Sequence, residues 1–334
     1  MDRRRILAGA SAAFSLSLAG CLGRAVDPIG TWFDDREPLP VDPPDDLPEY
    51  HRRYSPDVSV IDYDEADLGD VVGYVEPSVR SVELGDAVSF QLHARTEGGL
   101  VTNPVGWMLL KWERDQWFRV AGSGGGIFTS TVVEPDDSYV FTIETEPVDA
   151  VLDGQLAETE LHNDFDDVPA GNDLTLTLSG LGGGVYAFSR DGWLPEESSP
   201  EFVFHTPVYI DADPLYVTST KAISETEWDG DSLIAEREPE EDVIFGHTGV
   251  YVLEPVSETE ALEPEPLITE EIVRTVGGLP TAARDAFALY QEYDPDRVEI
   301  RQQTKDDPPF DIAKPRYYTY QDQSFRVTTD IIEE

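Results

Sequence analysis

The segment Val88-Ser89-Phe90-Gln91-Leu92-His93-Ala94 alternates apolar and polar residues without a break. Successive side chains of a β-strand point to opposite faces, so this segment predicts a strand with one buried and one solvent-facing side. Leu174-Thr175-Leu176-Thr177-Leu178 repeats the pattern. Between residues 71 and 210 no stretch keeps the 3.6-residue period of a helix over ten residues. We therefore expect a mainly β fold.

Similar short runs surround these two segments and are separated by Gly, Asp and Pro turns. We expect strands at Val71–Glu76, Ala87–Arg95, Gly106–Glu113, Trp117–Val120, Phe128–Val133, Ser138–Glu144, Leu174–Ser179, Val185–Ser189 and Glu201–Tyr209. Many short strands at this spacing are typical of a β-sandwich. Residues 71–210 are therefore predicted to form one.

Four motifs in this region resemble the immunoglobulin-like modules common on prokaryotic cell surfaces. The family's patterns GD.V.F.L, W.L.K, PGESY.F and GxYxF correspond here to Gly85 to Leu92, Trp107 to Trp112, Pro135 to Phe141 and Gly184 to Phe188. The third motif departs from the family, with Asp136-Asp137 in place of Gly-Glu. The resemblance implies an immunoglobulin-like β-sandwich with an adhesive or spacer role, and it names no ligand.

Three tryptophans fall on the predicted strands of the sandwich, namely Trp107, Trp112 and Trp117. They suit either a packed core and cross-strand pairs or a flat platform on which a sugar could stack. The core and cross-strand interpretation is favoured because all three lie within strands.

Residues 211–334 differ in character and predict a small α+β domain. We expect strands at Leu233–Ala235, Val298–Gln303, Tyr317–Tyr320 and Phe325–Thr329, a hairpin of Val243–Phe245 and Val250–Leu253 around Gly246–Gly249, and helices capped by Thr269 and Thr281. The first helix is expected to stop at Gly277 and the second at Asp294-Pro295. Glu225–Glu241 is acidic and predicts an exposed connector.

The first residues carry a basic head, a short apolar run and the only cysteine of the chain. Arg3 and Arg4 before the apolar run resemble a twin-arginine export signal, and Leu18-Ala19-Gly20-Cys21 resembles a lipobox. The apolar run is shorter than the roughly 20 residues of a membrane-spanning helix. The resemblance implies a signal peptide at residues 1–20 and lipid attachment at Cys21. An ordinary secretory signal with an incidental cysteine is the alternative.

The formal net charge of the chain is -45, from 68 acidic and 23 basic residues. Such a charge would repel itself in a compact protein unless concentrated salt screens it. Combined with the export signal, the acidity makes the chain resemble an exported haloarchaeal lipoprotein. A polyanionic surface for a basic partner or for cations is the alternative. Nucleic acid is excluded as a partner because its phosphates would be repelled.

Residues 21–69 are rich in proline and acids, with six prolines between Asp34 and Pro56. Proline restricts the backbone and like charges repel, so this segment predicts a semi-rigid tether between a membrane anchor and the folded part. Its aromatic residues leave open that some of it docks on the folded domain.

The sequence contains no recognisable catalytic or cofactor motif. Its five histidines are scattered singly, and HExxH, CxxC, GxSxG and P-loop patterns are absent. His93 and His205 fall within predicted strands and are expected to be structural. A weak calcium candidate is the acidic loop containing Asp164, Asp166 and Asp167, which lacks the EF-hand spacing. We expect no other metal and no cofactor.

These observations predict a lipid-anchored protein on the extracellular face of the cell membrane. Its expected role is binding, adhesion or envelope structure rather than catalysis, with the membrane as one partner and a protein or envelope partner of unspecified identity. A secreted hydrolase or metal-dependent enzyme that uses acidic residues is one alternative. A solute-binding lipoprotein is another, disfavoured because the chain has little βαβ alternation.

Overall fold

The computed structural model describes residues 36–42, 58–103, 106–122, 130–135, 137–146, 173–197, 202–239, 246–257, 263–305 and 307–332. Residues from Arg36 onward form one compact unit. Within the described ranges, no helix is both long and apolar enough to cross a membrane. The unit contains a β-sandwich followed by an α+β domain, which confirms the predicted mainly β fold.

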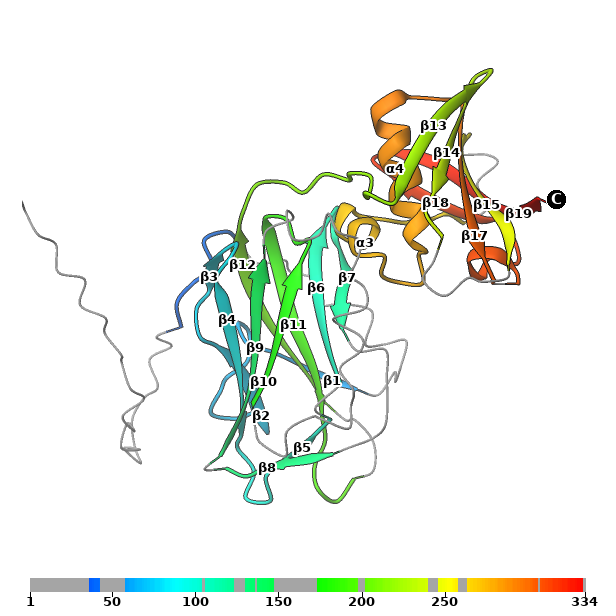
Figure 1. Cartoon of the computed structure of the whole chain (residues 1–334). Helices are drawn as coiled ribbons and strands as arrows, with labels where there is room; N and C mark the ends of the chain where they lie inside the picture. Colours follow the sequence, from blue (N-terminus) through cyan, green and yellow to red (C-terminus); the bar gives the residue numbers. More distant parts are fainter. Residues whose placement is uncertain are drawn as a thin grey trace, which may run out of the picture. The chain divides into compact units, whose positions relative to one another are not determined.

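Two sheets form the sandwich (Figure 1). One has the order β1-β12-β11-β6-β7, with β3 also paired to β12, and the other has the order β10-β9-β4-β2. Their strands are β1 (Ser59–Asp62), β2 (Gly73–Pro77), β3 (Ser81–Glu83), β4 (Ala87–Ala94), β6 (Trp107–Glu113), β7 (Gln116–Gly122), β9 (Ser138–Glu146), β10 (Asp173–Ser179), β11 (Gly184–Gly192) and β12 (Phe202–Asp211). A small separate pair joins β5 (Leu100–Thr102) to β8 (Thr131–Val133).

Alternation in β4 places its apolar side chains in the sandwich core, as the sequence predicts. Val88, Phe90 and Leu92 are buried, while the residues between them are partly exposed. Phe90 stacks on Phe188 from the other sheet with ring centroids 4.4 Å apart. Fully burying such a side chain stabilises the fold by roughly 1.5–3 kcal/mol. Contacts of this kind hold the two sheets together.

The strand order is compatible with the immunoglobulin-like arrangement that the sequence motifs suggest. β4 and β9 are neighbours in one sheet, while β6, β11 and β12 are consecutive neighbours in the other. β10 departs from a fully antiparallel sheet, because it pairs in parallel with β9. β3 also pairs in parallel with β12.

Part of the predicted tether belongs to the folded body. β1 pairs in parallel with β12, and the next residue, Tyr63, is buried. Arg36 donates hydrogen bonds to the carbonyl oxygens of Tyr63 and Ala66. The prediction of a tether through residue 69 was therefore wrong at its end. The strand is short and its partner lies about 140 residues later, so local composition could not reveal it.

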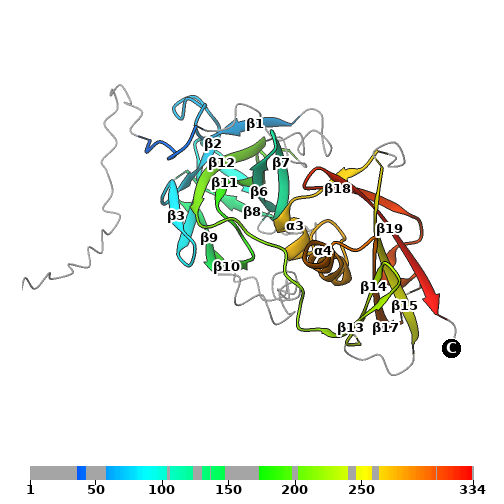
Figure 2. The same cartoon turned by 90° about the horizontal axis from the view of Figure 1, so that it is seen from above.

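The α+β domain has a mixed sheet with the order β13-β14-β17-β15-β19-β18-β16. Its elements are β13 (Ile223–Asp229), β14 (Ser232–Arg237), β15 (His247–Val256), β16 (Glu265–Pro266), α3 (Thr269–Arg274), α4 (Thr281–Tyr293), β17 (Arg297–Thr304), the 3-10 turn η3 (Pro309–Asp311), β18 (Arg316–Tyr320) and β19 (Gln323–Ile332). Figure 2 shows α4 against this sheet. Phe287 of α4 packs edge-on against Tyr320 and Phe325 of the sheet.

The helix ends differ from the predicted ones at three of four positions. Ile268 and Pro280 occupy the N-cap positions, so Thr269 and Thr281 are the first helical residues and not caps. The first helix ends before Gly277, at Thr275, and Thr275 adopts the left-handed conformation. Asp294 ends α4 as predicted, with φ of 49°. Glu271 supplies the reciprocal bond of a capping box for α3, because its carboxylate accepts from the amide of the N-cap residue Ile268 at 3.1 Å.

The turn predicted at Gly246–Gly249 is not formed, and the predicted partner strand Val243–Phe245 lies outside the described residues. β15 runs without a turn from His247 to Val256 and pairs with β17 and β19. A Cβ atom on Gly249 would lie 2.9 Å from the Thr304 side chain and 3.0 Å from Pro309. Close packing therefore explains this glycine, and a turn does not.

Candidate functional site

The residues predicted to form the export signal, the lipid attachment site and the calcium site lie outside the described part of the chain. These are Arg3, Arg4, Leu18, Ala19, Gly20 and Cys21 of the signal-like segment, and Asp164, Asp166 and Asp167 of the calcium candidate. Among the residues that the structure does describe, no group of three or more His, Cys, Asp or Glu side chains is arranged to hold a metal ion.

One serine, one histidine and one aspartate come together on the sandwich. The Ser189 hydroxyl lies 3.2 Å from Nδ1 of His205, and Asp62 Oδ2 lies 3.8 Å from its Nε2. Ser189 is 0% exposed and His205 1% exposed, and Trp117 packs edge-on against the imidazole. A nucleophile needs contact with its substrate. The trio is therefore a buried polar cluster without the access that a hydrolase requires.

Burial also changes the acidity of this cluster. Desolvation raises the pKa of Asp62 to about 6, although the backbone amides of Asp64 and Glu65 donate to its carboxylate. His93, the other histidine predicted to be structural, stacks on Tyr74 and lies 3.2 Å from Glu76. Its hydrogen bond lowers the pKa of Glu76. Both histidines thus have structural contacts.

A buried ionic junction joins the sandwich to the α+β domain. Lys111 of β6 places Nζ 2.5 Å from Oε1 of Glu270 in α3. The same oxygen accepts from the Gly182 amide at 3.2 Å and lies 3.5 Å from the Tyr186 hydroxyl. Glu270 is 1% exposed. A charge so deeply buried is tolerated only with such partners, so the junction fixes how β6 meets α3.

Arg274 supplies a second buried contact between the same two parts. Its Nε donates to the carbonyl oxygen of Val120 in β7 at 2.7 Å, and its Nη1 donates to the carbonyl oxygen of Ser179 in β10. The fixed fork of a guanidinium suits two acceptors at once. Arg274 therefore links α3 to strands from both sheets of the sandwich.

The segment 212–220 crosses from β12 to the α+β domain without regular structure and is held at both ends. At its start, the Gly183 amide donates to the carbonyl oxygen of Asp213 at 3.3 Å. At its end, the Thr220 amide donates to the buried Asp285 carboxylate at 2.6 Å. We call this segment the connector. Its backbone contacts show that it packs against both parts.

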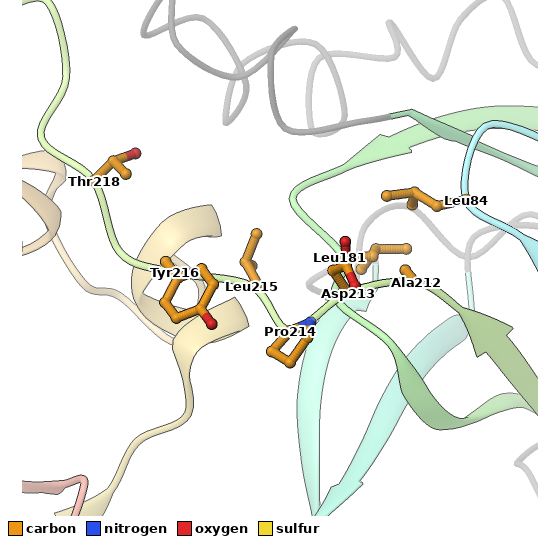
Figure 3. Close-up of a pocket in the computed structure, with 8 residues that line it drawn as sticks. All are labelled: Leu84, Leu181, Ala212, Asp213, Pro214, Leu215, Tyr216 and Thr218. Atoms are coloured by element: carbon orange, nitrogen blue, oxygen red, sulfur yellow. The ribbon is translucent and has the colours of Figure 1, made fainter.

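A cavity of about 400 Å³ lies along the connector (Figure 3). It is lined by Leu84, Leu181, Ala212, Asp213, Pro214, Leu215, Tyr216 and Thr218. The lining is mostly aliphatic, and Asp213 is its single ionisable carboxylate. Paired acids for glycoside hydrolysis need two carboxyl groups about 5–10 Å apart. The cavity offers apolar packing and lacks that pair.

Among the described strands longer than two residues, β13 is the most exposed. It is the terminal strand of its sheet in the pairing order, and all of its residues after Ile223 are exposed. Trp228 in this strand is 53% exposed. An edge strand presents backbone donors and acceptors that can pair with another chain. We call the unpaired side of Ile223–Asp229 the β13 edge.

The sequence interpretation missed the β13 edge as a possible site. It assigned residues 225–241 to an exposed connecting segment because the stretch is acidic. The available signal was a tryptophan, Trp228, placed between the acidic residues Glu227 and Asp229.

Comparisons with known proteins assign no family to the chain. No protein-family model matches it, and no curated protein matches it either.

Proposed function

We propose that this protein is a lipid-anchored extracytoplasmic protein that acts by binding a partner at the cell surface, in adhesion or in envelope structure. Its N-terminal segment supplies the anchor, with residues 1–20 as signal peptide and Cys21 as lipid attachment site. The acidic composition suits a surface in concentrated salt.

The β13 edge is the observation that carries the binding role. The polar clusters whose residue types occur in enzyme active sites are buried. The cavity along the connector has a single carboxylate in its lining. The β13 edge, in contrast, presents backbone groups and an exposed tryptophan to solvent. Strand addition to such an edge is a common mode of peptide recognition. These features support binding over hydrolysis.

Membrane fractionation tests the anchor. We expect the natural chain, produced in a salt-adapted host with twin-arginine export, to remain with membranes after a salt wash and to enter the detergent phase. Cys21→Ser should move the exported protein to the soluble fraction. Ser17→Ala, a matched change in the same segment that keeps the thiol, should leave it with the membranes. An exported Cys21→Ser protein that stayed membrane-bound would refute the lipid anchor.

A further inference from the structure

We propose that the β13 edge binds an extended peptide segment that carries Lys or Arg at every second position. This inference deepens the proposed binding function by naming the site and the chemistry of its partner. The peptide would add a strand beside β13, so that main-chain hydrogen bonds supply affinity and alternate side chains supply specificity.

The first argument is the position of β13 in its sheet. It pairs with β14 on one side, from Ile223 opposite Arg237 to Asp229 opposite Ser232. No strand among the described residues pairs with its other side. The last six residues of the strand are exposed. A row of main-chain groups is therefore accessible over the length of a short peptide.

The second argument is the division of side chains between the two faces of β13. Glu225, Glu227 and Asp229 occupy alternate positions and so lie on one face, while Thr226 and Trp228 lie on the other. An added strand places its own alternate side chains beside these two rows. Cations on alternate residues would meet the three carboxylates.

The register of β13 identifies what surrounds Trp228. It lies opposite Leu233, which belongs to the core that α4 covers. Trp228 therefore projects from the helix-covered side of the sheet, beyond the last covered strand. An apolar residue of the peptide on that face would pack on the exposed indole, which is 53% exposed in the free protein. The two faces thus require different residues from one peptide.

The same charges disfavour a second copy of this chain as the occupant. An antiparallel self-pairing centred on Thr226 would place Glu225 of one copy opposite Glu227 of the other. Like charges directly opposite each other destabilise a strand pair. A cationic strand turns the same positions into opposite-charge pairs. Charge complementarity therefore selects a basic peptide over a dimer.

Fluorescence anisotropy of a labelled peptide, titrated with the full chain in a salt concentration that keeps it folded, tests this inference. The probe is acetyl-Thr-Lys-Val-Arg-Val-Lys-Thr-amide, whose cations alternate with valines. Acetyl-Val-Thr-Lys-Arg-Lys-Thr-Val-amide has the same composition with contiguous cations. A third peptide has the first sequence with methylated amides at alternate residues. We expect the first peptide to bind at least tenfold more tightly than either of the others.

Protein variants locate the site. Glu227→Arg should weaken binding of the alternating peptide at least tenfold, and Glu227→Gln should weaken it less. Glu146→Arg makes the same charge change at an exposed position of β9 in the sandwich, and should change the affinity less than twofold. Circular dichroism of each variant verifies folding, and the methylated peptide tests strand pairing without altering the protein.

Four results would overturn the inference. They are equal affinity for the two isomeric peptides, equal weakening by Glu227→Arg and Glu146→Arg, no binding of the alternating peptide, and a concentration-dependent dimer that Glu227→Arg alters. Either of the first two results would indicate only general electrostatic attraction to an acidic protein. The third would indicate that the acidic residues of β13 only prevent other strands from pairing with this edge. Membrane fractionation is independent of peptide binding, so failure of the edge and failure of the anchor remain distinguishable.

Discussion

Lys111 of the sandwich and Glu270 of α3 form a buried ion pair, with Nζ 2.5 Å from Oε1 and side chains 10% and 1% exposed. Their positions are separated by 159 residues. The Gly182 amide and the Tyr186 hydroxyl approach the same oxygen, while the buried Oε2 has no hydrogen-bond partner among the described residues. The pair thus ties the α+β domain to a particular place on the sandwich.

Removing one partner of this pair should be more damaging than removing both. Lys111→Met leaves the Glu270 carboxylate buried without its cation, which typically costs about 3–5 kcal/mol of folding free energy. Adding Glu270→Gln removes the charge and keeps an oxygen that can accept from Gly182. We expect the double variant to be more stable than Lys111→Met alone, measured by chemical denaturation at constant salt.

The matched control for this cycle is an ion pair that lies nearer the surface. Arg297 and Glu299 lie 3.0 Å apart with side chains 41% and 17% exposed. Arg297→Met should cost no more than about 1 kcal/mol, since solvent already screens that pair. A Lys111→Met variant that lost no more stability than Arg297→Met would contradict the structural role of the junction.

Replacing Arg274 tests the second contact between the two parts. Arg274→Lys keeps a positive charge but cannot reach the Val120 and Ser179 carbonyl oxygens as a fork. A buried acceptor left without a donor costs about 1–3 kcal/mol. We expect a lower unfolding midpoint and faster protease cleavage within the connector. Arg297→Lys is the exposed control, and equal cleavage rates for the two variants would count against this role.

The pH dependence of stability should reveal Glu271. Burial raises its pKa from 4.5 to about 8, opposed by the hydrogen bond from the Ile268 amide, and the charges of Glu265 and Glu270 raise it further. The folded state therefore holds this proton more tightly than the unfolded state. Its contribution to stability is complete below about pH 4.5 and is lost as the pH rises through about 8.

Two other carboxyl groups act in the same direction over a lower range. Desolvation raises the pKa values of Asp62 and Asp191 to about 6. Their stabilising contributions are therefore lost between about pH 3.8 and pH 6. Between pH 6 and 8 the decline should come mainly from Glu271. Glu271→Gln retains an acceptor for the Ile268 amide and should flatten the unfolding free energy over that range. An unchanged slope in this variant would contradict the assignment.

The sequence predicted those parts of the fold whose signal is local. β4 was found because its alternation runs over eight residues, and β9 through β12 were found within a few residues of their ends. The strands β1 and β3 were missed because each is short and gains its structure from β12, far along the chain. Local periodicity carries no information on such pairing.

The candidate site was less predictable than the fold. The junction consists of one of only four lysines and one of 68 acidic residues, and the sequence does not show that Lys111 and Glu270 meet. The contact depends on how β6 and α3 pack. The β13 edge depends on the absence of a neighbouring strand in the described part of the sheet, which is a property of the whole topology.

Gly183 provides the last prediction, because its lack of a side chain lets the connector approach the sandwich. A Cβ atom at this position would lie 2.1 Å from the carbonyl oxygen of Ala212. Its φ is not in the left-handed range, so this contact, rather than backbone strain, is what alanine would disturb. Gly183→Ala should therefore displace the start of the connector and cost about 1–3 kcal/mol, as overpacking usually does.

Gly98→Ala is the control, since the nearest atom to its Cβ position is 3.8 Å away on Pro195. It should leave stability unchanged or raise it by up to about 1 kcal/mol by restricting the unfolded chain. Both variants are compared by chemical denaturation and by hydrogen exchange of the Gly183 amide region, where Gly183→Ala should expose the bond to Asp213. Equal denaturation midpoints and unchanged exchange would show that the connector does not need this close approach.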